Sequence, residues 1–349
     1  MTFATPPRYS KSQVNRAGHV LLSARPKSRA YQDALQIVNE WRTAHAYPMN
    51  TFQATLRLKV KKYGNAIVAQ RLKRLPTIID KLGRYPEMEL SRMQDIGGVR
   101  GVVDAIWQVR ELQAEYQDKT RFTHELAREH DYIDAPKSDG YRGVHLVYKY
   151  NNTLARNGLA GQYKGLSIEL QLRTKLQHTW ATAVESMGTL REESYKTNQG
   201  NKDWLEFFTL ISSAFAHVEG TALVPQYAHL NALETYRAVK KSEAKLNVLS
   251  QIRGLTLAAN AIHTQGAGGY YNLIVLNRKD RSVRIYSYAR DMLENATTKY
   301  AELEASANQD TDQVLVSAGK LKLLKAAYPN YFLDVRDFIE KVETIISEV

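Results

Sequence analysis

Apolar and polar residues follow two different periods along this chain, and each period predicts one type of element. Recurrence of apolar residues at helical spacing predicts helices over residues 30–47, 50–64 and 175–195, and one that ends near Lys119. Period-two alternation predicts strands over residues 99–103, 141–151 and 166–175. Residues 65–75 fit a strand or a short helix, and a helix then begins near Pro76. Interleaved strands and helices predict a mixed core over about residues 50–190.

The second half of the chain has a different organisation. Residues 200–262 are helical in pattern, and the glycines of residues 263–272 mark a boundary. The pattern then predicts a hairpin over residues 270–289 and a helix over 290–305. A strand over 313–318, a short helix over 320–327 and a closing helix over 335–349 follow. We expect an α+β protein with a mixed β-sheet core, flanking helices and a small C-terminal α+β domain. The expected divisions are a helical arm (1–50), the core (51–195), a helical extension (196–265) and the C-terminal domain (266–349).

Charge and composition restrict the class of protein. The chain has 48 Lys and Arg against 36 Asp and Glu, a net charge of +12. Such a charge favours polyanionic partners, but a soluble basic protein without such a partner can have the same charge. Nine basic residues and one acid lie between Arg57 and Arg84. The absence of cysteine excludes disulfides and thiolate metal sites. The N-terminus has no apolar leader, and no apolar run approaches about 18 residues, so we expect a soluble, cytoplasmic protein without membrane contact.

Two polar motifs in the first part of the core suit a nucleotide. Arg71, Lys73 and Lys81 surround a predicted helix start, where the helix dipole favours phosphate, although a basic helix is more often a solvated face. Asp95 precedes a glycine pair, and Arg100 lies in the strand that follows. A carboxylate in this position suits Mg²⁺, which takes one or two carboxylates plus substrate phosphates, although it also suits a residue that stabilises the turn.

Two further motifs lie on predicted strands. Lys137, Asp139, Tyr141, Arg142 and His145 surround the start of one strand, where Asp-Gly alone would indicate only a hairpin turn. On the next strand, alternation places Glu169, Gln171 and Arg173 on the face opposite Ile168, Leu170 and Leu172. By itself this pattern fits a half-exposed strand with a salt bridge. Together the four motifs supply cations for a triphosphate, two carboxylates for a metal and a hydroxyl, and a ring to stack on a base.

In order and spacing, these motifs over about residues 55–190 resemble the synthetase domain of the RelA/SpoT family, the alarmone synthetases, which has a nucleotidyltransferase-like core. The resemblance implies transfer of the β,γ-pyrophosphate of ATP to a ribose 3′-hydroxyl. It also implies the following roles: Arg71 and Arg100 flank adenine, Lys73 and Lys81 hold phosphates, Asp95 and Glu169 bind Mg²⁺, and Glu169 helps to activate the hydroxyl. On the acceptor side, Tyr141 stacks on the base, His145 contacts the acceptor or its phosphates, and Lys137, Arg142 and Gln171 bind the acceptor.

Two departures from the family pattern matter. Asp139 stands where the family often has Asn, and its negative charge disfavours a phosphate-rich acceptor such as GDP. The first fifty residues are too few for the hydrolase domain of the long family members, so we expect a synthetase that needs another restraint.

The C-terminal region resembles the antitoxin-like domain of fused toxic small alarmone synthetases of the CapRel type. That resemblance implies that Tyr328 and Tyr331 block the ATP site, that a phage capsid protein releases them, and that the toxic branch modifies the 3′ CCA end of tRNA. The alternative is purely structural: Tyr328 and Tyr331 could be two aromatic side chains that pack at a junction between helices. The related domain has a zinc-finger-like shape, but a chain without cysteine is not expected to bind zinc there.

Three functions are therefore compared. The first is a tRNA pyrophosphokinase restrained by its C-terminal domain, the second is a synthetase of guanosine tetra- or pentaphosphate from GDP or GTP, and the third is an inactive RNA-binding module. The complete set of Arg71, Asp95, Tyr141 and Glu169 argues against the third. The basic run from Arg57 to Arg84 favours the long polyanion of the first, because each neutralised phosphate adds affinity.

Overall fold

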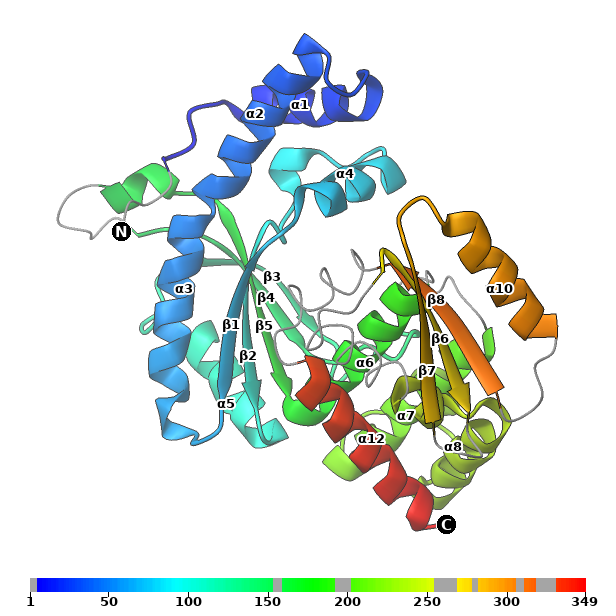
Figure 1. Cartoon of the computed structure of the whole chain (residues 1–349). Helices are drawn as coiled ribbons and strands as arrows, with labels where there is room; N and C mark the ends of the chain where they lie inside the picture. Colours follow the sequence, from blue (N-terminus) through cyan, green and yellow to red (C-terminus); the bar gives the residue numbers. More distant parts are fainter. Residues whose placement is uncertain are drawn as a thin grey trace. The chain divides into compact units, whose positions relative to one another are not determined.

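The computed structural model describes residues 5–152, 159–191, 202–253, 269–277, 282–305, 311–317 and 331–349 (Figure 1). The chain divides into two compact units. The first unit comprises Met1–Tyr132 and Gly143–Lys175, and the second comprises Ile133–Arg142 and Leu176–Val349. Within the described ranges, no helix combines the length and the apolar character needed to cross a bilayer.

The first unit is built on a five-stranded mixed sheet with the order β1-β2-β5-β4-β3. Its strands are β1 (Ile67–Leu72), β2 (Gly97–Val103), β3 (Glu125–Asp131), β4 (Val144–Lys149) and β5 (Ser167–Thr174). Strands β2 and β5 run parallel, and the other neighbours are antiparallel. The expected α+β fold with a mixed sheet is confirmed, and residues 67–72, which fitted a strand or a helix, form a strand.

The helices of this unit precede or connect these strands. They are α1 (Lys11–Ser23), α2 (Arg29–Ala44), α3 (Ala46–Lys59), α4 (Leu75–Arg84) and α5 (Ile106–Gln117), with short 3₁₀ turns at Val60–Lys62, Leu90–Arg92 and Leu159–Tyr163. Helix α3 packs against β1 and β2 (Figure 1). Gly101 of β2 permits this approach, because a Cβ atom there would lie 3.2 Å from Leu56 of α3. One face of the sheet is thereby buried under apolar side chains.

The opposite face of the sheet carries the polar residues of β5. Along β5, Ile168, Leu170 and Leu172 are fully buried, whereas Glu169 and Gln171 are half-buried. This alternation confirms the one read from the sequence, except that Arg173 is also buried.

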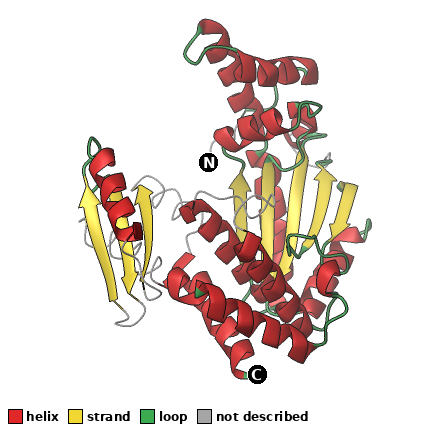
Figure 2. Cartoon of the chain, turned by 90° about the vertical axis from the view of Figure 1, so that its right-hand side faces the viewer, coloured by secondary structure: helices red, strands yellow, loops and turns green. Residues whose placement is uncertain are grey.

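The second unit contains a helical part and a small sheet. The helices are α6 (Lys175–Arg191), α7 (Lys202–Glu219), α8 (Ala232–Leu246) and α12 (Tyr331–Ser347), with a 3₁₀ turn at Pro225–Tyr227. The antiparallel sheet has the order β7-β6-β8 and contains β6 (Tyr271–Asn277), β7 (Ser282–Tyr288) and β8 (Thr311–Ser317). Helix α10 (Leu293–Ala305) packs against β6 and β8 (Figure 2). The predicted hairpin, the helix after it and the closing helix are confirmed, and the predicted helix at 320–327 lies outside the described residues.

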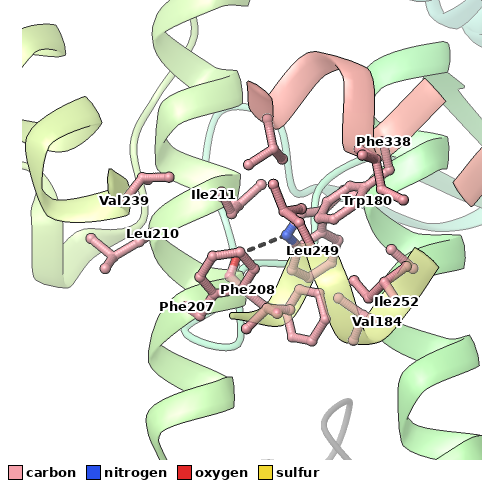
Figure 3. Close-up of a cluster of buried hydrophobic side chains, with 14 of the residues drawn as sticks. Trp180, Val184, Phe207, Phe208, Leu210, Ile211, Val239, Leu249, Ile252 and Phe338 are labelled. Carbon is pink, nitrogen blue, oxygen red and sulfur yellow. Dashed lines mark hydrogen bonds between the residues drawn. The ribbon is translucent and has the colours of Figure 1, made fainter. Parts of the chain in front are cut away.

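The helical part of the second unit has its own aromatic core (Figure 3). The indole N–H of Trp180 on α6 donates to the carbonyl oxygen of Phe208 on α7, at 2.7 Å. Phe338 of α12 is fully buried, and its ring centroid lies 6.2 Å from that of Phe208 and 6.0 Å from that of Phe215. The last helix of the chain therefore belongs to the same core as α6 and α7.

Candidate active site

Asp95 lies between two lysines at the entrance to β2. Its Oδ2 is 2.7 Å from Nζ of Lys73, and its Oδ1 is 3.0 Å from Nζ of Lys81. The side chains of Lys81 and Asp95 are 25% exposed and that of Lys73 is 14% exposed, so water screens these pairs only in part. The structure thus brings together residues that the sequence places in two separate motifs, and their roles stay predictions.

The backbone around Lys73 is fixed from two sides. Its amide N–H donates to the carbonyl oxygen of Ile96 at 2.8 Å, and its carbonyl oxygen accepts from Nε of Arg42 at 2.7 Å. Pro76 is the second residue of α4, and the first turn of a helix suits a residue without an amide hydrogen. Lys81 follows in the last turn of this helix, and Arg71 lies on β1, so these cations come from a strand, a loop and a helix.

Asp95 is held in its ionised form. Burial raises the pKa of its carboxyl group, but the charges of Lys73 and Lys81 and their hydrogen bonds outweigh burial and bring this pKa below its usual value. The site therefore contains a carboxylate with two ammonium groups that could exchange it for another anion.

Glu169 on β5 is the second carboxylate. His145 of β4 contacts its Oε1 through Nδ1 at 2.9 Å, and the amide of Gln171 donates to its Oε2 at 2.8 Å. Burial raises the pKa of Glu169, but the hydrogen bond and charge of His145 and the hydrogen bond of Gln171 keep it below the usual value. The negative charge of Asp95 acts in the opposite direction on this pKa, so the two carboxylates lie within electrostatic range of each other.

Two arginines extend this network across the sheet. Nε of Arg100 on β2 donates to Oε1 of Gln171 at 3.3 Å, and Nη2 of Arg173 donates to the same oxygen at 3.2 Å. Tyr132 lies edge-on to His145, with ring centroids 5.3 Å apart. Glu169 is thus held by a continuous set of polar contacts that spans three strands.

Gly98 lies in the middle of this polar face. Its register partners are Arg71 on β1 and Glu169 on β5. A Cβ atom at Gly98 would meet only backbone oxygens, at 3.7 Å for Arg71 and 3.9 Å for Glu169. A strand glycine without close neighbours leaves room for a ligand to approach the backbone.

The segment with Lys137 and Tyr141 belongs to the second unit. Nζ of Lys137 lies 5.3 Å from the centroid of the Tyr141 ring, and the backbone N–H of Tyr141 donates to Oδ1 of Asp139 at 2.8 Å. Asp139, which stands where the family often has Asn, therefore accepts a turn hydrogen bond that an Asn side chain would also accept.

Arg142 anchors this segment to the helices of the second unit. It is 3% exposed, donates to Thr221 and to the carbonyl oxygen of Ala222, and lies 3.6 Å from a carboxylate oxygen of Glu219. Gly140 has a positive φ of 91°, and a Cβ atom there would lie 2.8 Å from the ring of Trp180. Acceptor binding by Arg142 stays a prediction, and its burial favours a role in holding the loop in place.

Of the two tyrosines expected to inhibit the enzyme, Tyr328 lies outside the described residues. Tyr331 is the first residue of α12. Their proposed role stays a prediction.

Several contacts at the site were not predicted from the sequence. Arg42 and Tyr132 support Lys73 and His145, and Glu219 faces Arg142. Of these residues, only Tyr132 could have been found from the local sequence, because it directly follows β3. That inference would first require β3 to be predicted as a strand.

The basic run from Arg57 to Arg84 is partly neutralised. Five of its nine cations pair with carboxylates: Lys59 and Lys62 with Glu115, Lys73 and Lys81 with Asp95, and Arg84 with Asp80. This pairing leaves less uncompensated positive charge in the run than its composition indicates.

Similarity to known proteins covers part of the chain. Residues 70–199 match the family described as "Region found in RelA / SpoT proteins". This segment contains the second half of β1, strands β2 to β5, Asp95 and Glu169, so both carboxylates lie within the matched segment.

Two curated relatives match over a similar length. "GTP pyrophosphokinase YjbM" of Bacillus subtilis is 34% identical over 125 residues, which cover 34% of this chain and 54% of the relative. The protein Rv1366 of Mycobacterium tuberculosis is 33% identical over 127 residues, or 34% of this chain and 38% of that protein. The chain thus spans about half the length of the first relative and less of the second.

Solved structures are similar at lower identity. A GTP pyrophosphokinase family protein from Streptococcus pneumoniae is 22% identical, with a TM-score of 0.43, covering 52% of this chain and 89% of that one. The small alarmone synthetase 2 of Bacillus subtilis is 19% identical, with a TM-score of 0.44, covering 52% and 94%.

Proposed function

We propose that the protein is an ATP-dependent pyrophosphokinase, which transfers the β,γ-pyrophosphate of ATP to a ribose 3′-hydroxyl and releases AMP. The observation that carries the proposal is the presence of two carboxylates within electrostatic range of each other: Asp95, held by Lys73 and Lys81 just before β2, and Glu169, held by His145 and Gln171. This arrangement lies within the segment that matches the RelA/SpoT region.

The donor nucleotide would bind near β1, α4 and β2. Arg71 and Arg100 would flank the adenine, since guanidinium planes stack on aromatic rings. Lys73 and Lys81 would hold the phosphates after exchanging Asp95 for them. Such an exchange is favourable when a divalent cation takes over the carboxylate, because each charge then keeps a partner.

The residues present suit Mg²⁺. Asp95 and Glu169 are both ionised and within electrostatic range, and Mg²⁺ is commonly held by one or two carboxylates plus substrate phosphates. Among the described residues, no cluster of three or more His, Asp or Glu could hold a metal by itself, so substrate oxygens would complete the shell. Bound there, the cation would neutralise the charge on the transferred pyrophosphate.

Glu169 would orient the acceptor hydroxyl. Its lowered pKa makes it a hydrogen-bond acceptor for the 3′-OH at neutral pH. The 3′-oxygen then bonds to the β-phosphorus, the bond from that phosphorus to the α-phosphate oxygen breaks, and AMP leaves while the hydroxyl proton passes to Glu169 or solvent. As the resemblance implies, Tyr141 would stack on the acceptor base, Lys137 would bind the acceptor, and His145 would contact the acceptor or its phosphates.

Two acceptor classes are proposed. The match to "GTP pyrophosphokinase YjbM" favours GDP or GTP. The net charge of +12 favours the 3′ CCA end of tRNA. The ion pairs in the basic run lower the positive charge available to bind tRNA and so weaken this argument. Incubation of the whole chain with γ-labelled ATP and GDP, GTP or deacylated tRNA separately decides between them. Transfer to tRNA alone, weakened by rising salt, selects tRNA, and salt-insensitive transfer to GDP or GTP selects alarmone synthesis.

Inhibition by the C-terminal segment is a further part of the proposal. Tyr328 and Tyr331 would compete with ATP as a tethered ligand, and a phage capsid protein would release them. Tyr328→Ala and Tyr331→Ala in the full-length chain should raise basal transfer and growth inhibition, and cells that express the wild type should stop growing only on phage infection. Tyr270→Ala is the control, because Tyr270 is an exposed tyrosine of the same region. Unchanged transfer by both variants contradicts the inhibitory role.

A further inference from the structure

We infer that Gln171 is a positioning residue: it fixes Glu169 and keeps two guanidinium groups from pairing with it. This inference rests on the proposed pyrophosphate transfer and deepens it. It assigns Gln171 a different role from the acceptor binding that the resemblance implied.

The hydrogen bonds of Gln171 allow only one orientation of its amide. Nε2 donates to Oε2 of Glu169 at 2.8 Å, and Oε1 accepts from Arg100 at 3.3 Å and from Arg173 at 3.2 Å. A carboxylate can only accept and a guanidinium can only donate, so a flipped amide would lose all three bonds. Both lone pairs of the amide oxygen are used in this way.

The register of three strands produces this arrangement. Gln171 is the direct partner of Arg100 on β2 and of His145 on β4. Glu169 and Arg173 are two residues away on the same strand and therefore share its face. A neutral side chain thus lies in a row between a guanidinium and an imidazole, with the carboxylate next to it.

The arrangement holds both oxygens of Glu169. His145 contacts Oε1 and Gln171 contacts Oε2, which limits rotation of the carboxylate. Without the amide, Arg173, which is only 3% exposed, and Arg100 would lose an acceptor close to this anion. A guanidinium that loses this acceptor can donate to the adjacent carboxylate instead, so Glu169 would turn toward the arginines and away from the acceptor hydroxyl.

Two substitutions separate this role from a purely structural one. Gln171→Met keeps the size and removes all three hydrogen bonds. Gln171→Glu keeps an acceptor for Arg100 and Arg173 but replaces the donor to Glu169 with a negative charge. Gln171→Glu should therefore be at least as stable as Gln171→Met and yet less active. Gln70→Met is the control, because Gln70 is exposed on β1 of the same sheet.

The experiment measures kcat, KM for each substrate and the denaturant midpoint of the wild type and the three variants. We expect kcat to fall at least about tenfold in Gln171→Met and further in Gln171→Glu, with KM for the acceptor changed by less than about threefold. A raised acceptor KM with unchanged kcat, or activity that simply follows stability, overturns the inference. A folded wild type that transfers nothing to any acceptor contradicts the proposed function instead.

Discussion

Nζ of Lys73 lies 2.7 Å from Oδ2 of Asp95, so the cation expected to bind phosphate is paired with the anion expected to bind metal. We predict that Asp95→Asn lowers pyrophosphate transfer at least about 100-fold, because it removes the metal ligand, while the fold persists. Because the pair is partly exposed, the free energy of unfolding should fall by only about 1 kcal/mol. The measurements are labelled transfer and chemical denaturation.

Asp80→Asn is the matched control for this prediction. Asp80 pairs with Arg84 on the exposed side of α4, close to Lys81 in sequence. Its loss should change neither transfer nor stability appreciably. Near-wild-type turnover by Asp95→Asn would show that Asp95 does not hold the metal.

Gly97 and Gly98 are neighbours with opposite surroundings, and they separate folding from substrate binding. A Cβ atom on Gly97 would lie 2.8 Å from Cδ1 of Ile168, whereas one on Gly98 would be at least 3.7 Å from any neighbour. Gly97→Ala should therefore destabilise the first unit by about 1–3 kcal/mol. Gly98→Val should leave the stability within about 1 kcal/mol but lower transfer at least about tenfold, because the side chain fills the space beside Glu169. Unimpaired transfer by a folded Gly98→Val protein contradicts the placement of substrate over Gly98.

His45 makes the stability of the first unit depend on pH. It is 1% exposed, and burial lowers its pKa from 6.5 to about 4, against the opposing effect of its hydrogen bond to the Trp41 carbonyl oxygen. Between these two values the unfolded chain binds a proton that the folded chain does not, so stability falls as the pH is lowered from 6.5 to about 4. The full contribution of His45 is about 3 kcal/mol.

The difference between the wild type and His45→Asn isolates this effect, because an Asn amide can donate to Trp41 but does not titrate. Denaturant unfolding of both proteins at pH 7, 6, 5 and 4 gives the comparison. Parallel pH profiles of the two proteins would show that folding leaves the pKa of His45 unchanged, which contradicts its lowering by burial.

Phe338 connects the last helix of the chain to the helical core of the second unit. It is fully buried and contacts Phe208 and Phe215, so Phe338→Ala should cost about 3–5 kcal/mol. A truncation that removes α12 would expose the same core and could unfold the second unit. Such a truncation therefore does not test whether the C-terminal segment inhibits the enzyme. Thermal unfolding measures the effect, with Lys341→Ala on the same helix as a control. A change below about 1 kcal/mol for Phe338→Ala contradicts the packing of α12 into this core.

The parts of the fold with clear apolar periodicity could be predicted from the sequence. The alternation along β5 placed Glu169 and Gln171 on one face, because Leu170 and Leu172 must be buried. Strand β3 was missed because Glu125–Asp131 is mostly charged. It lies at the edge of the sheet, where few side chains are buried and an alternation of apolar and polar residues is not required. Helix α1 was expected only as part of a helical arm over residues 1–50, without bounds, although Ser10 and Gln13 form a capping box at its start.

The contacts that fix the site are less predictable because they join distant residues. Arg42 reaches Lys73 across 31 residues, and Arg142 reaches Thr221 across 79. The residue types in the motifs indicated which groups are expected to bind a nucleotide. The pairing of Lys73 and Lys81 with Asp95 and the burial of Arg142 could not be predicted in this way, because they depend on how the elements pack. The tyrosines at 328 and 331, the acceptor and the division into an arm, core, extension and C-terminal domain stay predictions.

The position of label transfer from ATP tests the central proposal most directly. The full-length protein, with Asp95→Asn as the inactive control, is incubated with Mg²⁺, each acceptor, and ATP labelled at either the α- or the γ-phosphate. Pyrophosphate transfer predicts that γ-label enters the acceptor at its 3′-oxygen while α-label appears only in AMP. Entry of α-label into the acceptor, formation of ADP in place of AMP, or no transfer by the folded wild type to any acceptor would contradict it.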